Sequence, residues 1–189
     1  MTTKNRRIVV IDVETTGLSP QKGSRIVEVG MIGLDNGDIR QEFHSLINPH
    51  VRIPFSVQKI HGITNEMIEN APGPEAVFPE IRRFIGSAVV VAHHAAFDLG
   101  FIRAEMARLG LGFDPPHQCT LQLSRRLFPE LSNHRLATVA RHVLGAIPDA
   151  LQLHRALDDA RLVAQVWLEM KIVERREKQA GQNHDNWKA

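Results

Sequence analysis

Cysteine is almost absent from this sequence. Cys119 is the only one in 189 residues, which excludes an internal disulfide and a cysteine-rich zinc site. Hydrophobic residues make up 43% of the chain, but no apolar run approaches the roughly 18 residues needed to span a bilayer. The first residues also lack the apolar segment and cleavage site of a secretory signal. We therefore expect a globular protein of the reducing cytoplasm, with no membrane partner.

A strong charge of one sign is also lacking. The 23 Lys and Arg residues nearly balance the 21 acidic residues, so the net charge is only +2 and the pI is near 9.0. Such a balance permits a nucleic-acid partner without demanding one. There is no internal repeat, low-complexity block, glycine-rich phosphate loop or interdomain linker. We expect one domain over residues 1–174 and a polar, frayed tail over residues 175–189.

The first apolar run of the chain ends in a pair of acids. Residues 8–11 are all β-branched, which is typical of a strand buried on both faces. Because side chains alternate along a strand, Asp12 and Glu14 should point to the same side, roughly 7 Å apart. Two such carboxylates repel each other and are poorly solvated unless a cation lies between them. The pair therefore suggests a metal site, although an acid at a strand end is most often a turn former or a helix cap.

The remaining pattern predicts a mixed α/β sheet with helices on its faces. Strands are expected at 25–34 and 39–47, joined by an Asn-Gly turn into an antiparallel meander with the first strand. A second buried strand is expected at 88–92. Residues 119–127 fit either a strand or a helix. Helical spacing marks the segments 75–85, 98–109, 133–144 and about 154 to 174.

Two further acids stand at helix starts. Asp98 follows the second buried strand and opens a helix, where an acid is ordinarily stabilised by the helix dipole. Asp159 lies on the apolar stripe that continues through Val163, Val166 and Met170. A carboxylate on such a stripe needs a partner.

The sequence offers more than one partner for Asp159. The simplest is an ion pair with Arg155 at i−4, with Asp158 as the more natural solvent-facing acid. His154 is five positions from Asp159, about 140° around an ideal helix. It reaches the same site only if it lies at or before the start of the helix.

Acids of this kind, without a cysteine cluster, suit hard cations such as Mg²⁺ or Mn²⁺ better than zinc. In a two-metal site, one ion lowers the pKa of a water molecule and the other stabilises the leaving oxygen of an in-line displacement at phosphorus. A histidine, with an unperturbed pKa near 6.5, can accept the proton of that water at neutral pH. The neighbouring His93 and His94 could suggest a separate zinc site, but a structural role is the more frequent one.

Three segments together resemble the exonuclease motifs of the DEDDh family. They are residues 12–18, 95–101 and 154–159, and they occur in the family's order. The family includes ribonuclease T, oligoribonuclease and the proofreading epsilon subunit of DNA polymerase III. Residues 61–64 and 120–144 are similar to the epsilon-like branch. The resemblance implies a ribonuclease H-like fold with a mixed five-stranded sheet, and 3′→5′ removal of nucleoside 5′-monophosphates from DNA or RNA with two divalent metals, Mg²⁺ or Mn²⁺.

The resemblance also implies roles for individual residues. The implied metal ligands are Asp12, Glu14, Asp98 and Asp159, with His154 as the general base. The implied contacts to the substrate are Thr15, Thr16, Leu18, His61, His94 and Phe101. For Leu18 and Phe101, plain loop and core positions remain open alternatives. The tyrosine variant of the family is excluded because the chain has no tyrosine.

Two positions depart from the family's usual pattern. His94 stands where asparagine is usual, and Cys119 stands where aspartate is frequent. Neither belongs to the acidic set, so the departures bear on substrate preference. The implied partners are single-stranded or frayed 3′ ends. The alternative is a proofreading or binding subunit that acts mainly beside a DNA polymerase catalytic subunit.

Overall fold

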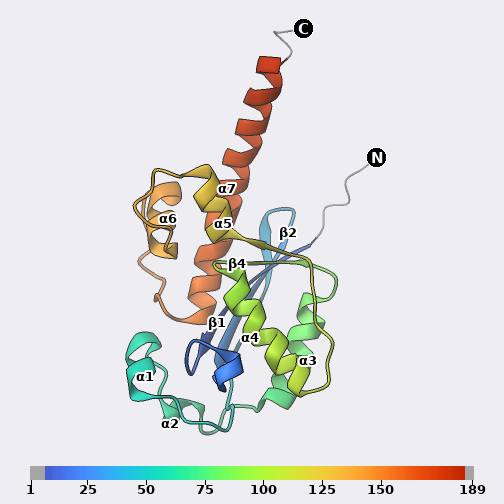
Figure 1. Cartoon of the computed structure of the whole chain (residues 1–189), viewed down its shortest axis with the longest axis vertical. Coiled ribbons are helices and arrows are strands. Elements are labelled where there is room, and N and C mark those ends of the chain that lie inside the picture. The colour runs from blue at the N-terminus through green and yellow to red at the C-terminus, as the bar shows by residue number, and fades with distance from the viewer. Residues whose placement is uncertain (1–6, 186–189) are drawn as a thin grey trace.

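The computed structural model describes residues 7–185, with side chains described as far as residue 180. A five-stranded sheet with the order β3-β2-β1-β4-β5 forms its centre (Figure 1). The strands are β1 (Ile8–Thr15), β2 (Ile26–Asp35), β3 (Asp38–Leu46), β4 (Val89–Ala92) and β5 (His117–Cys119). The first three strands are antiparallel, whereas β4 runs parallel to β1 and β5 runs parallel to β4. The predicted mixed sheet of five strands is confirmed.

Helices cover both faces of this sheet. They are η1 (Pro20–Lys22), α1 (Phe55–His61), α2 (Asn65–Ile68), α3 (Pro74–Ile85), α4 (Ala95–Arg108), α5 (Thr120–Leu127), α6 (Leu136–Leu144) and α7 (Ala156–Asp185). One core cluster packs α3 and α4 against the sheet, and a second packs α5, α6 and α7 against its other face. Within residues 7–185, no helix has the length and apolarity required to cross a membrane.

The alternation of side chains along β1 decides where its acids lie. Val9, Ile11 and Val13 belong to the cluster with α3 and α4, whereas Val10 belongs to the cluster with α7. Because successive side chains of a strand point to opposite faces, the acids at positions 12 and 14 follow Val10 to the α7 side. The central strand therefore ends with two carboxylates directed toward the start of α7.

A glycine lets α7 approach the sheet closely. Gly30 of β2 is paired with Asp12 of β1. A Cβ atom at Gly30 would lie 2.3 Å from the carbonyl carbon of Ala156 and 2.3 Å from the amide nitrogen of Leu157. Real Cβ atoms do not approach backbone so closely. Only glycine therefore lets the first turn of α7 rest against the strand beside the acids.

The structure corrects one boundary and resolves an ambiguity. Helix α7 continues to Asp185, so the expected helix end at about Glu174 was wrong and residues 175–185 are helical instead of frayed. Residues 174–180 are mostly strong helix formers, and Glu174 pairs with Lys178 one turn later at 3.4 Å. Residues 186–189 of the expected tail lie outside the described residues. The ambiguous segment divides into the short strand β5 and the helix α5.

Candidate active site

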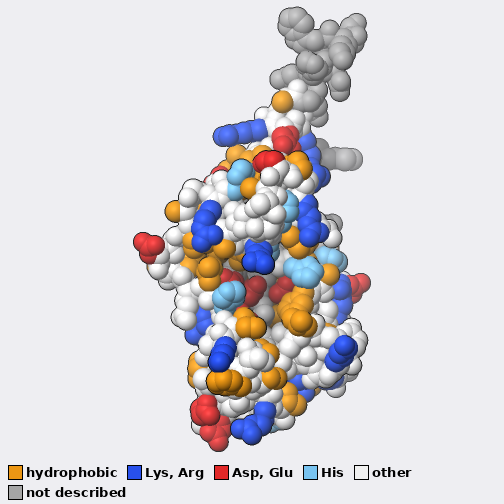
Figure 2. Space-filling view, turned by 60° about the vertical axis from the view of Figure 1, so that its left-hand side comes forward, with side chains coloured by type: hydrophobic (Ala, Val, Ile, Leu, Met, Phe, Trp, Pro, Cys, Tyr) orange, Lys and Arg blue, Asp and Glu red, His pale blue; other side chains and the backbone are white. Residues whose placement is uncertain are grey.

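Acidic side chains from three elements converge at the end of β1. Glu14 of β1, Asp159 of α7 and His154 each offer one ligand atom, and these three atoms lie within 4.8 Å of one another. Asp12 lies close enough to Asp98 of α4, and to the other acids, for their charges to raise its pKa. Figure 2 shows acidic side chains in a hollow of the surface, with histidine and basic side chains around it. Glu14, Asp159 and His154 therefore lie at metal-site distance from one another, and Asp12 and Asp98 lie within electrostatic reach of this group.

Burial and mutual repulsion disfavour the ionised form of these carboxyl groups. Burial, reinforced by Asp98, Asp159 and Glu14, holds the pKa of Asp12 well above its usual range. Burial raises the pKa of Glu14 to about 8, with a further contribution from Asp159. Burial also raises the pKa of Asp98 to about 8 and that of Asp159 to about 6. At neutral pH the group cannot be fully ionised without a compensating positive charge.

One oxygen of the cluster has no partner within the protein. Oδ1 of Asp159 is buried and makes no hydrogen bond with any group in residues 7–185. Its other oxygen, Oδ2, accepts a hydrogen bond of 3.0 Å from the amide of His154. A buried carboxylate oxygen is costly to leave unpaired. Carboxylate oxygens in this number fit a hard divalent cation such as Mg²⁺ or Mn²⁺.

His154 lies just before α7, as its spacing from Asp159 required. Helix α7 begins at Ala156, and the backbone of His154 is left-handed, with φ 65°. This turn brings the exposed imidazole of His154 to Glu14 and Asp159. The position at the helix start is confirmed. A helical His154 would lie about 140° from Asp159.

Arg155 does not form the expected ion pair with Asp159. Its Nη2 atom lies 2.6 Å from Oε1 of Glu28 on β2. Asp158, the expected solvent-facing acid, is bound by Arg161 at 2.8 Å. Asp159 is thus left free of a cationic partner among these arginines and faces the acidic cluster.

Sequence reasoning missed the role of Glu28. Its side chain is 0% exposed, and its carboxylate accepts hydrogen bonds from His44, Arg155 and the amide of Ala156. Burial raises the pKa of Glu28, but these three donors outweigh that effect and lower it to about 2. The available signal was a glutamate among apolar residues on one face of a predicted strand.

The loop after β1 uses its threonine hydroxyls internally. Thr15 and Thr16 are 7% and 8% exposed. The Thr15 hydroxyl donates to the Gly17 carbonyl at 2.6 Å, and the Thr16 hydroxyl accepts from the Arg25 amide at 2.9 Å. Leu18, by contrast, is 88% exposed. The structure therefore leaves the Leu18 side chain, and not the two hydroxyls, open to a ligand.

The remaining candidate contacts differ in accessibility. His61 is 3% exposed, and its Nε2 atom has no hydrogen-bond partner in the part of the chain that the structure describes. His94 is exposed at φ 82°, with its ring stacked 6.2 Å from that of Phe97. Phe101 is 1% exposed and packs 4.9 Å from Phe97. The structure thus places Phe101 in the core, the alternative that the sequence had left open.

His93 belongs to a structural network. Its Nδ1 atom lies 2.9 Å from the Thr120 hydroxyl, and its Nε2 atom lies 2.8 Å from the His134 carbonyl. Burial lowers the pKa of His93 and favours the neutral ring. Because both ring nitrogens have protein partners, the structural interpretation of this histidine holds over a zinc site.

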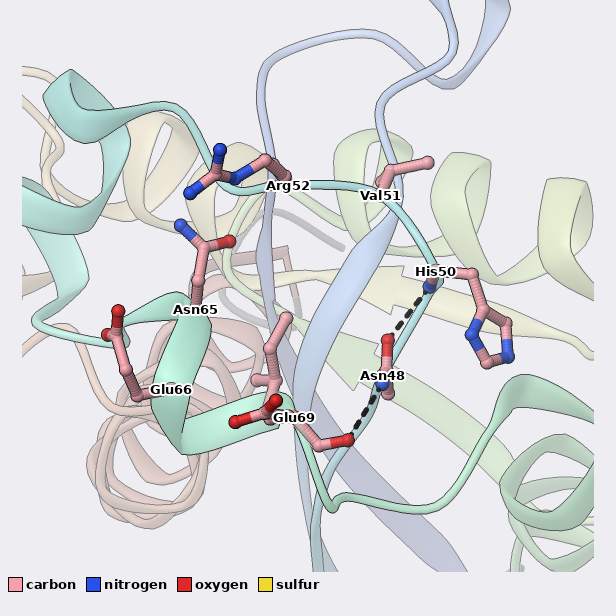
Figure 3. A pocket seen from close by; sticks show the side chains of 8 residues that line it. Asn48, His50, Val51, Arg52, Asn65, Glu66 and Glu69 are labelled. Atoms are coloured by element: carbon pink, nitrogen blue, oxygen red, sulfur yellow. Dashed lines mark hydrogen bonds between the residues drawn. The ribbon is translucent and has the colours of Figure 1, made fainter.

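Figure 3 shows a second hollow in the surface. It has a volume of about 350 Å³ and is lined by side chains from residues 48–52 and from α2 with its C-terminal end. Within it, Asn48 accepts a hydrogen bond from the His50 amide and donates one to the Glu69 carbonyl (Figure 3). Its lining includes none of the converging acids, so we assign the chemistry to the acidic cluster.

The raised pKa values predict how stability depends on pH. Glu14, Asp98 and Asp159 hold protons in the folded, metal-free protein at pH values where the unfolded chain has released them. Stability should therefore fall as the pH rises from about 4 to about 8. Glu28, whose pKa is lowered, acts in the opposite direction below about pH 5 and is ionised in both states above about pH 5.5. A divalent cation, which binds the ionised carboxylates, should restore the lost stability.

Thermal melting at pH 6 and pH 8, after chelation and after adding Mg²⁺, measures this effect. We expect the rise in melting temperature on adding Mg²⁺ to be about 5 °C larger at pH 8 than at pH 6. An equal rise at both pH values would contradict the assignment of the raised pKa values to the metal ligands.

Comparison with known proteins identifies the family of the chain. A family model described as "Exonuclease" matches residues 9–167. The 3'-5' exonuclease DinG of Bacillus subtilis is 37% identical over 171 residues, which cover 87% of this chain and 18% of that protein. The PolC-type DNA polymerase III of Thermotoga maritima is 42% identical over 161 residues, 85% of this chain and 11% of that protein. The chain thus spans less than a fifth of the length of these relatives.

Solved structures of exonucleases are similar to this chain in fold. Exonuclease X in complex with 5' overhanging duplex DNA is 29% identical, with a TM-score of 0.68 over 86% of this chain and 90% of that chain. The nuclease domain of 3'hExo, a DEDDh family member bound to rAMP, is 18% identical, with a TM-score of 0.75 over 90% of this chain and 94% of that one. The chain therefore belongs to the exonuclease family and has the fold of its DEDDh members.

Proposed function

We propose that this chain is a metal-dependent 3′→5′ exonuclease that releases nucleoside 5′-monophosphates from DNA or RNA. The observation that carries the proposal is that Glu14, Asp159 and His154 lie at metal-site distance, within electrostatic reach of Asp12 and Asp98, with one unpaired oxygen on Asp159. The similarity to DinG, named a 3'-5' exonuclease, and to an exonuclease X bound to DNA supports the direction and the substrate class.

The ligands for divalent cations in this proposal are Asp12, Glu14, Asp98 and Asp159. Two such cations, Mg²⁺ or Mn²⁺, would supply Lewis-acid stabilisation of the negative charge that develops on the phosphodiester. The protein holds the carboxylates in place before the substrate arrives. Asp12 and Glu14 sit on the central strand, and Asp98 lies in the first turn of α4.

We assign the general base to His154. Its imidazole is exposed and lies beside Glu14 and Asp159, where it can receive the proton of the attacking water. The amide of the same residue donates to Asp159. One short turn therefore places both the base and a ligand.

Replacing His154 tests whether this residue acts as the general base and not as a metal ligand. We expect His154→Ala to lower turnover by about 100-fold or more and to keep most of the metal affinity. His154→Asn is the companion variant, because asparagine tolerates a positive φ better than alanine. His50→Ala is the matched control, since His50 also has a positive φ, of 58°, and lines the separate hollow. Calorimetry that showed metal binding abolished in both His154 variants would contradict the base assignment.

The side chains proposed to contact the substrate differ in how exposed they are. Leu18 follows Glu14 by four residues and is 88% exposed, which makes its side chain the best suited to contact the terminal nucleotide. His94 opens α4 in place of the family's usual asparagine and presents an exposed ring. The Thr15 and Thr16 hydroxyls are used within the loop, and His61 is buried.

The direction and the substrate can be tested with labelled oligonucleotides. Matched DNA and RNA, single stranded and with a recessed or frayed 3′ end, are incubated with Mg²⁺ or Mn²⁺. A 5′ label should yield a descending ladder, and the released product should be a nucleoside 5′-monophosphate. If the purified protein shortens neither DNA nor RNA, the proposal is wrong.

A second candidate function is proofreading beside a DNA polymerase. It is favoured by the similarity to PolC-type DNA polymerase III, in which the matching segment is 11% of the Thermotoga maritima protein. Co-purification with a polymerase catalytic subunit, together with faster removal of a mismatched 3′ nucleotide, would support it. Full activity of a monodisperse protein that binds no polymerase would count against it.

A further inference from the structure

Glu28 forms a buried clamp on the start of α7. Its Oε1 atom accepts hydrogen bonds from His44 Nε2 at 2.7 Å and from Arg155 Nη2 at 2.6 Å. Its Oε2 atom accepts from the Ala156 amide at 2.9 Å. The donors come from β3, from the residue before α7 and from the first residue of α7. One carboxylate therefore ties the helix start to two strands.

The two residues of the α7 start that Glu28 binds lie between His154 and Asp159 in the chain. His154 immediately precedes Arg155, and its amide is bound by Asp159 one turn into the helix. Gly30, two residues after Glu28 on the same strand, provides the space into which the backbone of Ala156 fits. The position of the helix start thus sets where the imidazole and the Asp159 carboxylate lie.

We propose that Glu28 is a positioning residue for the proposed exonuclease reaction, acting through Arg155 and Ala156 to hold His154 and Asp159 in place. The inference rests on the proposed function. The reaction then requires the Glu28 carboxylate, although this group touches neither the metals nor the substrate.

Stability alone does not account for an anion at this position. Glu28 is paired with Glu14 across the two strands, so two acidic side chains lie side by side. Replacing a buried ion pair with well-packed apolar residues is often neutral or stabilising. The geometric benefit is specific, because a planar guanidinium and a carboxylate meet through two atoms and fix an orientation.

The chain offers a matched control for the clamp. Glu42 of β3 pairs with Arg161 of α7 through two hydrogen bonds, of 2.6 and 3.1 Å. This pair also ties α7 to the sheet, but it lies about one and a half turns further along the helix and on the surface. If the two pairs only attach the helix to the sheet, breaking either pair should lower the activity. If Glu28 positions the catalytic residues, only breaking the Glu28 pair should do so.

The test compares Glu28→Gln, Arg155→Gln, their double variant and Glu42→Gln. We expect Glu28→Gln to lower kcat by about 10- to 100-fold and to change KM less than about threefold. The double variant should lose little more than either single variant, because the two residues act as one unit. Arg155→Lys, which keeps a donor, should recover part of the activity. Glu42→Gln should keep kcat within about twofold of the parent.

A second readout needs no substrate. Mn²⁺ affinity, measured by calorimetry on the folded variants, should fall for Glu28→Gln and stay unchanged for Glu42→Gln. Parent-like kcat and Mn²⁺ affinity in Glu28→Gln, or independent effects of the two single changes, would overturn the inference. If the parent protein itself cleaves no oligonucleotide, the proposed function fails, and the Mn²⁺ measurement then tests the clamp on its own.

Discussion

Asp12→Asn is expected to lower exonuclease turnover by at least about 1,000-fold while leaving the protein folded. Asp12 lies on the central strand and is influenced by the other three acids of the cluster. An amide of nearly the same shape fills the same space but removes the negative charge that would hold a cation.

The same change should have the opposite effect on the metal-free protein. Burial and like charges raise the pKa of Asp12, so its ionised form opposes folding at pH 8. Asp12→Asn removes that penalty. We expect a metal-free melting temperature equal to or above that of the parent, and a much smaller rise on adding Mg²⁺. Loss of function together with unimpaired stability distinguishes a ligand from a residue that supports the fold.

Asp158→Asn is the control for Asp12→Asn. Asp158 adjoins a proposed ligand but is bound by Arg161 and by the amide of Gln152. We expect turnover within about threefold of the parent. Parent-like cleavage by Asp12→Asn, or an equal loss in Asp158→Asn, would show that the acidic cluster is not the catalytic centre.

Much of this site was predictable because the chain presents it in local patterns. A β-branched run placed Asp12 and Glu14 on one side of a buried strand, and the alternation of the core clusters around Val10 bears this out. An apolar stripe placed Asp159 toward the interior. The spacing of five residues made the position of His154 conditional on the helix start, which the structure places at Ala156.

What could not be predicted depends on contacts between distant parts of the chain. Arg155 pairs with Glu28, which is 127 positions earlier, and no local rule favours that partner over Asp159 at i+4. Likewise, the burial of Phe101 follows from its packing with Phe97 and the sheet, which periodicity alone does not reveal. Interior side chains of this kind are fixed by tertiary packing.

The end of α7 was missed for a related reason. Charged residues after Glu174 suggested a tail, because no apolar stripe continues there. In the structure Glu174 binds Arg126 of α5 and also Lys171 and Lys178 of its own helix. Ion pairs at helical spacing and strong helix formers continue the helix without a buried face.

Gly30→Ala should damage both the fold and the proposed activity. The added Cβ would lie 2.3 to 2.4 Å from three backbone atoms of Ala156 and Leu157. A normal contact needs about 1 Å more. The clashing atoms belong to the backbone, so no rotation of a side chain can provide this space. We expect the free energy of unfolding to fall by about 3 kcal/mol. The start of α7 would have to move away from the strand.

That movement acts directly on the proposed chemistry. His154 and Asp159 lie on either side of Ala156, so a displacement of about 1 Å carries the base and one ligand away from Asp12 and Glu14. Misplacement on this scale can lower turnover by about 100-fold. Denaturant unfolding and the oligonucleotide assay, performed where the variant is fully folded, separate the two losses.

Gly33→Ala on the same strand provides the comparison. A Cβ atom there would lie 3.2 Å from the end of the Arg7 side chain and 3.4 Å from Cβ of Gln41. The Arg7 guanidinium can move, so the expected cost is less than about 1 kcal/mol with unchanged turnover. If Gly30→Ala were as mild as Gly33→Ala, the close approach of α7 to β2 would not be what brings the two halves of the acidic cluster together.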